Sequence, residues 1–153
     1  MLFTARGHLE LEPGSPCLIR IGRPMVETIL LVGSEGINAH SLVWDLLKAD
    51  YQVRYAASDS SAIRIVDIET PSAVLLTEES DKVKEICSSI RSIAPTLPLL
   101  VIGRERDMDI KVKFFQADAD DYILEPFDSA ELIARIRSAV RRSSKESLTR
   151  KSL

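Results

Sequence analysis

Short apolar runs alternate with stretches of helical apolar spacing along most of this chain. Runs such as Thr28–Val32 and Leu99–Ile102 are almost continuously apolar, which is typical of strands buried on both faces of a sheet. The predicted strands are Thr28–Val32, Gln52–Ala56, Val74–Leu76, Leu99–Ile102 and Asp121–Leu124. The predicted helices, with apolar residues three or four positions apart, are Ile37–Ala49, Ser60–Ile68, Lys82–Ile93, Asp107–Ala117 and Ser129–Arg142.

This alternation predicts an α/β fold with a doubly wound parallel sheet, which helices cover on both faces through right-handed crossovers. In such a sheet the working site lies outside the carboxyl ends of the strands. Function is therefore expected in the residues that directly follow each strand.

The two ends of the chain lack this alternation. Residues 1–24 form an N-terminal extension in which HLELE and CLIRI alternate around a turn-rich insert, Pro13–Pro16, and this pattern predicts a hairpin. Residues 143–153 are polar and basic without a core pattern, so we expect a flexible tail. One domain, residues 25–142, lies between them.

Composition narrows the class of protein. The chain has 153 residues, 45% hydrophobic and 28% charged, which suits one globular domain. A net charge of -3 gives no electrostatic case for nucleic-acid binding by the domain as a whole. Cys17 and Cys87 do not indicate a zinc site or a disulfide framework. No signal peptide or membrane-spanning run is evident, so a cytoplasmic setting without membrane contact is expected.

Candidate catalytic groups are sparse. His8 and His40 are isolated, and neither a Ser-His-Asp nor a Cys-His arrangement nor a metal-binding motif is present. The sequence therefore predicts a protein that is not an enzyme and that has no cofactor.

A resemblance to a known family rests on four sequence segments: ILLV, PSAVLL, LPLLVIG and ADDYILEPFDSAELIARI. In order and spacing they resemble the receiver domain of two-component response regulators, over roughly Val26 to Arg142. The resemblance implies a flavodoxin-like (βα)5 fold with a five-stranded parallel sheet in three α/β/α layers. It also implies a role in signal transduction or transcription regulation.

The family's phosphorylation site is altered at each position that the resemblance identifies. Receivers carry two acidic residues after the first strand for Mg²⁺, an acceptor aspartate after the third, a hydroxyl residue after the fourth and a lysine after the fifth. This sequence has Gly33, Ser34, Thr77, Gly103 and Glu125 at those positions. The resemblance therefore implies a pseudo-receiver that acts independently of phosphorylation.

Several features qualify this interpretation. Only Glu35 and Glu78 offer carboxylates to a metal, from shifted positions, and a different register of the third strand would make Glu78 or Asp81 the acceptor. Tyr122 falls at the family's switch-like aromatic position, although a half-buried strand tyrosine fits equally well. The Glu125–Pro126 bond matches a cis peptide of the family.

A dimer is the expected mode of action. Met108, Val112 and Phe115 form an apolar stripe beside a second one made of Ile110, Phe114 and Ala117. The winged-helix transcription-factor class dimerises through the fourth helix, fifth strand and fifth helix, and that resemblance implies a centre of Val112, Phe115 and Ile133. Around it Lys111 would pair with Glu131 and Asp121 with Arg135 across a two-fold axis, with Asp120 alongside.

Other partners stay open. Glu131 and Arg135 also form an i,i+4 pair within one helix, and a different protein partner would fit the Met108–Phe115 stripe. DNA would be contacted only through an effector domain that this chain does not contain. A second hypothesis is a flavodoxin-like protein that binds a nucleotide or flavin phosphate at the Gly33–Gly36 loop.

Overall fold

The structure is a computed structural model that describes residues 26–33, 37–77, 81–104, 106–109, 111–112 and 118–151. Within the described residues, five parallel strands form one sheet in the order β2-β1-β3-β4-β5. The strands are β1 (Thr28–Val32), β2 (Gln52–Ala56), β3 (Ala73–Leu76), β4 (Leu99–Gly103) and β5 (Asp121–Leu124). The predicted fold class is confirmed, and the bounds of β1, β2 and β5 agree with the prediction. The predicted hairpin in residues 1–24 lies outside the described residues.

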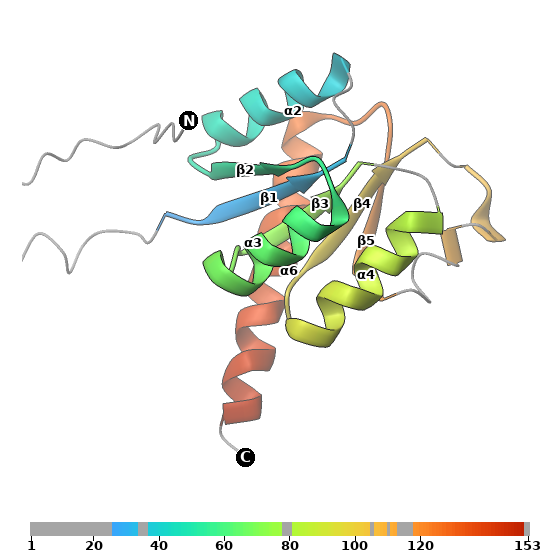
Figure 1. The fold of residues 1–153 in the computed structure, drawn as a ribbon. Helices are drawn as coiled ribbons and strands as arrows, with labels where there is room; N and C mark the ends of the chain where they lie inside the picture. Colours follow the sequence, from blue (N-terminus) through green and yellow to red (C-terminus); the bar gives the residue numbers. More distant parts are fainter. Residues whose placement is uncertain are drawn as a thin grey trace, which may run out of the picture.

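Helices cover both faces of the sheet (Figure 1). Their bounds are α2 (Ile37–Lys48), α3 (Asp59–Glu69), α4 (Asp81–Ile93) and α6 (Ser129–Lys151). Helices α2 and α6 pack through Leu42, Leu46, Leu132 and Ile136 onto one face. Helices α3 and α4 pack onto the other. Of the predicted helix Asp107–Ala117, residues 107–109 and 111–112 are described. Residues 108–109 and 111–112 are helical, whereas Asp107 is not.

The central strands of the sheet form the centre of the core, because helices cover their side chains on both faces. Every residue of β3 and β4 is buried, as expected of central strands in a doubly wound sheet. Helix α3 begins at Asp59, one residue earlier than predicted, because the Ser58 hydroxyl accepts a hydrogen bond from the Ser61 amide at 3.3 Å. None of the described helices is long and apolar enough to span a bilayer.

The last helix is longer than predicted. The sequence placed its end at Arg142, and this is wrong because α6 continues to Lys151. The Ser143 hydroxyl donates to the carbonyl of Thr96, and the Ser144 hydroxyl donates to the carbonyl of Val140 at 3.0 Å. Once the first turns of a helix are packed on the core, each further residue adds one backbone hydrogen bond. The helix can therefore continue without an apolar stripe. The absence of a core pattern was therefore a poor guide to the end of this helix.

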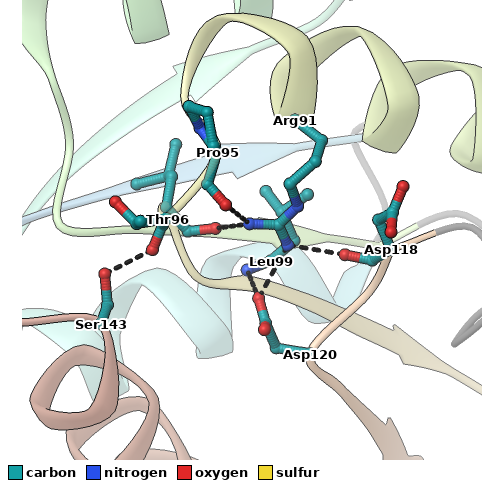
Figure 2. Close-up of polar contacts among 8 residues, drawn as sticks. Arg91, Pro95, Thr96, Leu99, Asp118, Asp120 and Ser143 are labelled. Carbon is teal, nitrogen blue, oxygen red and sulfur yellow. Dashed lines mark hydrogen bonds and ion pairs between the residues drawn. The ribbon is translucent and has the colours of Figure 1, made fainter. Parts of the chain in front are cut away.

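Arg91 joins the end of α4 to the amino ends of β4 and β5 (Figure 2). Its guanidinium donates to the carbonyls of Pro95 and Leu97 at 2.8 Å and of Asp118 at 2.6 Å. It also pairs with the Asp120 carboxylate at 3.0 Å, and that carboxylate accepts the Leu99 amide at 2.8 Å. This network lies at the edge of the sheet opposite the candidate site. It holds the register of the edge strand without taking part in the site.

Candidate functional site

The carboxyl edge of the sheet gathers four of the five predicted site positions. Gly33, Thr77 and Glu125 directly follow β1, β3 and β5, and Gly103 is the last residue of β4. The register pairs Val32 with Leu76 and Gly103 with Leu124, so the residues that follow meet at one rim. Ser34 and the shifted carboxylates Glu35 and Glu78 lie outside the described residues.

Gly33 and Thr77 fit each other closely. Gly33 has a φ of +151°, a conformation that favours glycine. A Cβ added there would overlap Oγ1 of Thr77 and lie 3.1 Å from its Cβ. The Thr77 hydroxyl donates to the Val32 carbonyl at 3.1 Å, and the Thr77 amide donates to the same oxygen at 2.9 Å. The threonine side chain therefore fills the space where a side chain at position 33 would begin.

Tyr55 covers this pair from the neighbouring strand. Its hydroxyl donates to the Gly33 carbonyl, and the Gly33 amide donates to the Ala56 carbonyl at 3.4 Å. The cavity lined here by Val32, Gly33, Ala57, Asp59, Leu76, Val83 and Ile86 has a volume of about 20 Å³. That is room for about one water molecule. Among the described residues, little space therefore remains beside Gly33 on the side of α3 and α4.

Glu125 is neutralised by a neighbour that the sequence analysis missed. Its carboxylate pairs with Nε of Arg104 at 3.0 Å. The backbone brings the two residues together, because the Glu125 amide donates to the Gly103 carbonyl at 2.7 Å. The Arg104 side chain is 75% exposed and that of Glu125 is 21% exposed, so the pair lies at the rim. The Glu125–Pro126 peptide bond is cis, as the resemblance implied.

Of the four predicted ion-pair residues, Arg135 contacts Asp121 and Glu131 within a single chain. Arg135 pairs with Asp121 at 2.8 Å and with Glu131 at 3.1 Å. The hydrogen bond from Arg135 to Asp121 is the main cause that raises the pKa of this guanidinium. Lys111 lies over the ring of the buried Tyr122, 5.4 Å from its centroid.

The apolar part of this face is described only in part. Met108 is 66% exposed and Val112 is 45% exposed, whereas Ile133 is half-buried against the core. Ile110, Phe114, Phe115 and Ala117 lie outside the described residues. Asp120 is held by Arg91 and the Leu99 amide, on the side away from Arg135.

Comparison with known proteins places the chain in a family. Residues 29–137 match the family described as the response regulator receiver domain. The response regulator MprA of Mycolicibacterium vanbaalenii is 32% identical over 117 residues, which are 75% of this chain and 51% of that protein. The chain thus spans about half the length of this relative.

Solved structures agree with this match. A protein described as a response regulator from Chloroflexus aurantiacus is 28% identical with a TM-score of 0.69, covering 76% of this chain and 98% of that chain. NtrX from Brucella abortus is 22% identical with a TM-score of 0.75, covering 84% of this chain and 30% of that chain, and supports the fold alone. The chain belongs to the response regulator receiver domain family of two-component signalling.

Proposed function

We propose that this receiver domain signals without aspartyl phosphorylation and acts through dimerisation or through a protein partner on the same face. The observation that carries the proposal is the closed contact of Gly33 with Thr77, at the two positions where receivers hold Mg²⁺ and accept the phosphoryl group. The remaining positions, Gly103 and Glu125, support it.

The described side chains at this rim do not fit a magnesium ion. Mg²⁺ requires oxygen ligands in near-octahedral geometry, with carboxylates usually among them. Gly33 offers no side chain, and the hydroxyl of Thr77 already donates to the Val32 carbonyl. The Gly33 carbonyl accepts the Tyr55 hydroxyl.

Charge at the end of β5 also opposes a phosphoryl group. Phosphoryl transfer depends on cations that neutralise the oxygens of the transferred group. The resemblance places a lysine where this chain has Glu125. At a separation of about 5 Å and an effective dielectric of about 20, reversing one unit charge turns about 3 kcal/mol of attraction into repulsion of equal size. Arg104 is engaged with Glu125 and offsets part of this repulsion.

Acetyl phosphate with Mg²⁺ tests the proposal directly. We expect the intact mass and the oligomeric state of the chain to stay unchanged, while a receiver with a complete site gains one phosphoryl group in a parallel sample. A stable phosphoryl adduct mapped to Glu78 or Asp81 would contradict the proposal, because it would mean that the third strand supplies an acceptor after all.

A homodimer through the predicted fourth helix, β5 and α6 is the mode of action that we propose. Met108 and Val112 present apolar surface to solvent on this face. Because Arg135 and Asp121 already pair within one chain, a two-fold-related copy meets a neutralised pair. We therefore expect apolar contact, rather than the ion pairs, to provide most of the affinity.

Sedimentation velocity tests the dimer. Val112→Glu puts a charge into the apolar centre and is expected to convert dimers to monomers, and Arg135→Glu is expected to weaken them less. Ile68→Glu is the matched control, since Ile68 is an apolar residue of α3 that is 72% exposed. A monomeric native chain would favour a different protein partner, and a dimer unaffected by Val112→Glu would contradict this interface.

The flavin or nucleotide alternative at the Gly33–Gly36 loop is not favoured. The matched relatives are response regulators. Gly33 is the described end of the loop. Its carbonyl accepts the Tyr55 hydroxyl, and its amide donates to the Ala56 carbonyl. Residues 34–36 lie outside the described residues.

A further inference from the structure

A second hollow opens at the carboxyl edge of the sheet, on the side covered by α2 and α6. Its volume is about 520 Å³, compared with about 20 Å³ at the ends of β1 and β3. It is lined by Ser41, Leu42, Asp45, Arg104, Arg106, Glu125, Pro126, Phe127 and Ser129. Pockets that hold small organic ligands have volumes of about 300 to 1,000 Å³. The size of this cavity therefore suits an organic molecule rather than a bare ion.

The lining carries charges of both signs. Arg104 is oriented by its 3.0 Å pair with Glu125, and Arg106 is exposed beside it. On the opposite wall the Asp45 carboxylate accepts the Ser129 hydroxyl at 2.7 Å, which joins α2 to the first turn of α6. Among the described residues, two guanidinium groups and two carboxylates thus line one cavity. A simple anion would be attracted by one pair and repelled by the other.

Besides Ser41 and Ser129, the rest of the described wall is apolar. Leu42 is buried in the core, and Phe127 packs half-buried against the same cluster. Pro126 continues this surface. A flat ring system lies favourably against an aromatic and aliphatic wall of this kind.

We propose that this cavity binds a nucleoside monophosphate. Arg104 and Arg106 supply the donors that phosphate oxygens accept, in the fork geometry that suits them. Asp45 and Glu125 accept hydrogen bonds from ribose hydroxyls or an exocyclic amino group. Leu42, Pro126 and Phe127 provide the surface for the base. The site uses none of the residues of the Gly33–Thr77 contact, but it shares Glu125 with the altered phosphorylation site and so rests in part on the proposed function.

Amide chemical shifts in a titration of the full chain test this site. The probes are adenosine and guanosine 5′-monophosphate, with adenosine and inorganic phosphate as the two partial ligands. We expect at least one monophosphate to shift the amides of Arg104, Arg106 and Ser129, with an affinity at least about tenfold above either partial ligand.

Arg106→Glu is the decisive variant, because Arg106 is an exposed residue whose replacement leaves the core intact. We expect it to lower the affinity by about tenfold or more, the effect of losing one hydrogen bond to a charged group. Arg64→Glu makes the same charge change on α3, across the sheet, and is expected to leave the affinity unchanged.

Three results would overturn the proposal. The first is the absence of shifts at the lining residues with both monophosphates at millimolar concentration. The second is equal binding of inorganic phosphate and the monophosphates, which would reduce the site to two surface arginines. The third is equal loss of affinity in Arg64→Glu and Arg106→Glu, which would indicate a general charge effect.

Discussion

Replacing Gly33 with alanine tests the closed rim most sharply, because it adds a single carbon where the structure leaves no space. The new Cβ would overlap Oγ1 of Thr77 and lie 3.1 Å from its Cβ. The backbone of Gly33 also has a φ of +151°. Two separate penalties are therefore expected, one from the backbone and one from the contact with Thr77.

Each penalty has a size that follows from the structure. An alanine held at a sparsely populated positive φ costs about 1 to 3 kcal/mol. Rotating the Thr77 hydroxyl away from the new carbon breaks its 3.1 Å bond to the Val32 carbonyl, which is worth about 0.5 to 1.5 kcal/mol. We expect Gly33→Ala to lower the free energy of unfolding by about 2 to 4 kcal/mol in total.

A double-mutant cycle with Thr77→Ala separates the two penalties. Removing the hydroxyl relieves the overlap but leaves the backbone strain, so Gly33→Ala should cost about 1 kcal/mol less in the Thr77→Ala background. Urea unfolding, followed by circular dichroism, measures all four corners of the cycle. The slope of free energy against urea must stay constant across the four proteins for the comparison to hold.

Two outcomes would refute this reasoning. A cost below about 0.5 kcal/mol for Gly33→Ala would mean that the rim relaxes freely, as surface positions do. Equal costs in both backgrounds would mean that residues 33 and 77 do not contact each other in solution. Either result would remove the main support for a closed phosphorylation site.

Three further predictions concern other parts of the fold. Arg91→Met keeps the aliphatic stem but leaves three backbone carbonyls and the Asp120 carboxylate without their donor. The free energy of unfolding, measured by urea denaturation, should therefore fall by about 2 to 3 kcal/mol. An unchanged free energy would contradict the network of Figure 2. Burial raises the pKa of Cys87 to about 11. In a Cys17→Ser variant the native thiol should resist a disulfide reagent at pH 8, and rapid labelling without unfolding would argue against its burial. Because the unfolded thiol loses its proton at about pH 8.5, the contribution of Cys87 to stability is present below that pH and is lost as pH rises toward the folded pKa. Ser143→Ala should cost about 0.5 to 1.5 kcal/mol in the same urea assay if the hydroxyl bond to Thr96 forms in solution.

The central strands were predictable because residues that are buried on both faces of a sheet form a continuous apolar run in the sequence. β1 was recognisable from its apolar run, and its bounds agree with the structure. The end of α6 was not predictable in this way, because its last turns add helix without adding buried side chains. Apolar patterns report on packing against the core and say little about where an exposed helix stops.

The positions of the site were predictable, but its contacts were not. A strand end can be read from the sequence, so Thr77 and Glu125 were located correctly at the rim. Which side chain fills or neutralises another depends on register between strands far apart in the chain. Tyr55 reaches Gly33, and Arg104 reaches Glu125, through pairings that no local pattern records.

A receiver that carries no phosphoryl group must be switched by something that binds its two conformations unequally. Moving an equilibrium from 1:99 to 99:1 requires about 5.5 kcal/mol of differential binding. A ligand that binds only one state shifts the equilibrium by RT ln(1 + [L]/Kd), so this shift requires a free ligand concentration of about 10,000 times the dissociation constant. For a dissociation constant of about 1 mM, that concentration is about 10 M, which no ligand reaches. The affinity measured for a nucleoside monophosphate therefore decides the role of the cavity beside Glu125. Millimolar binding would leave most of the switching free energy to dimerisation, whose bias grows with protein concentration. Submicromolar binding would allow the ligand to act as the signal itself, because about 1 mM of free ligand would then be enough.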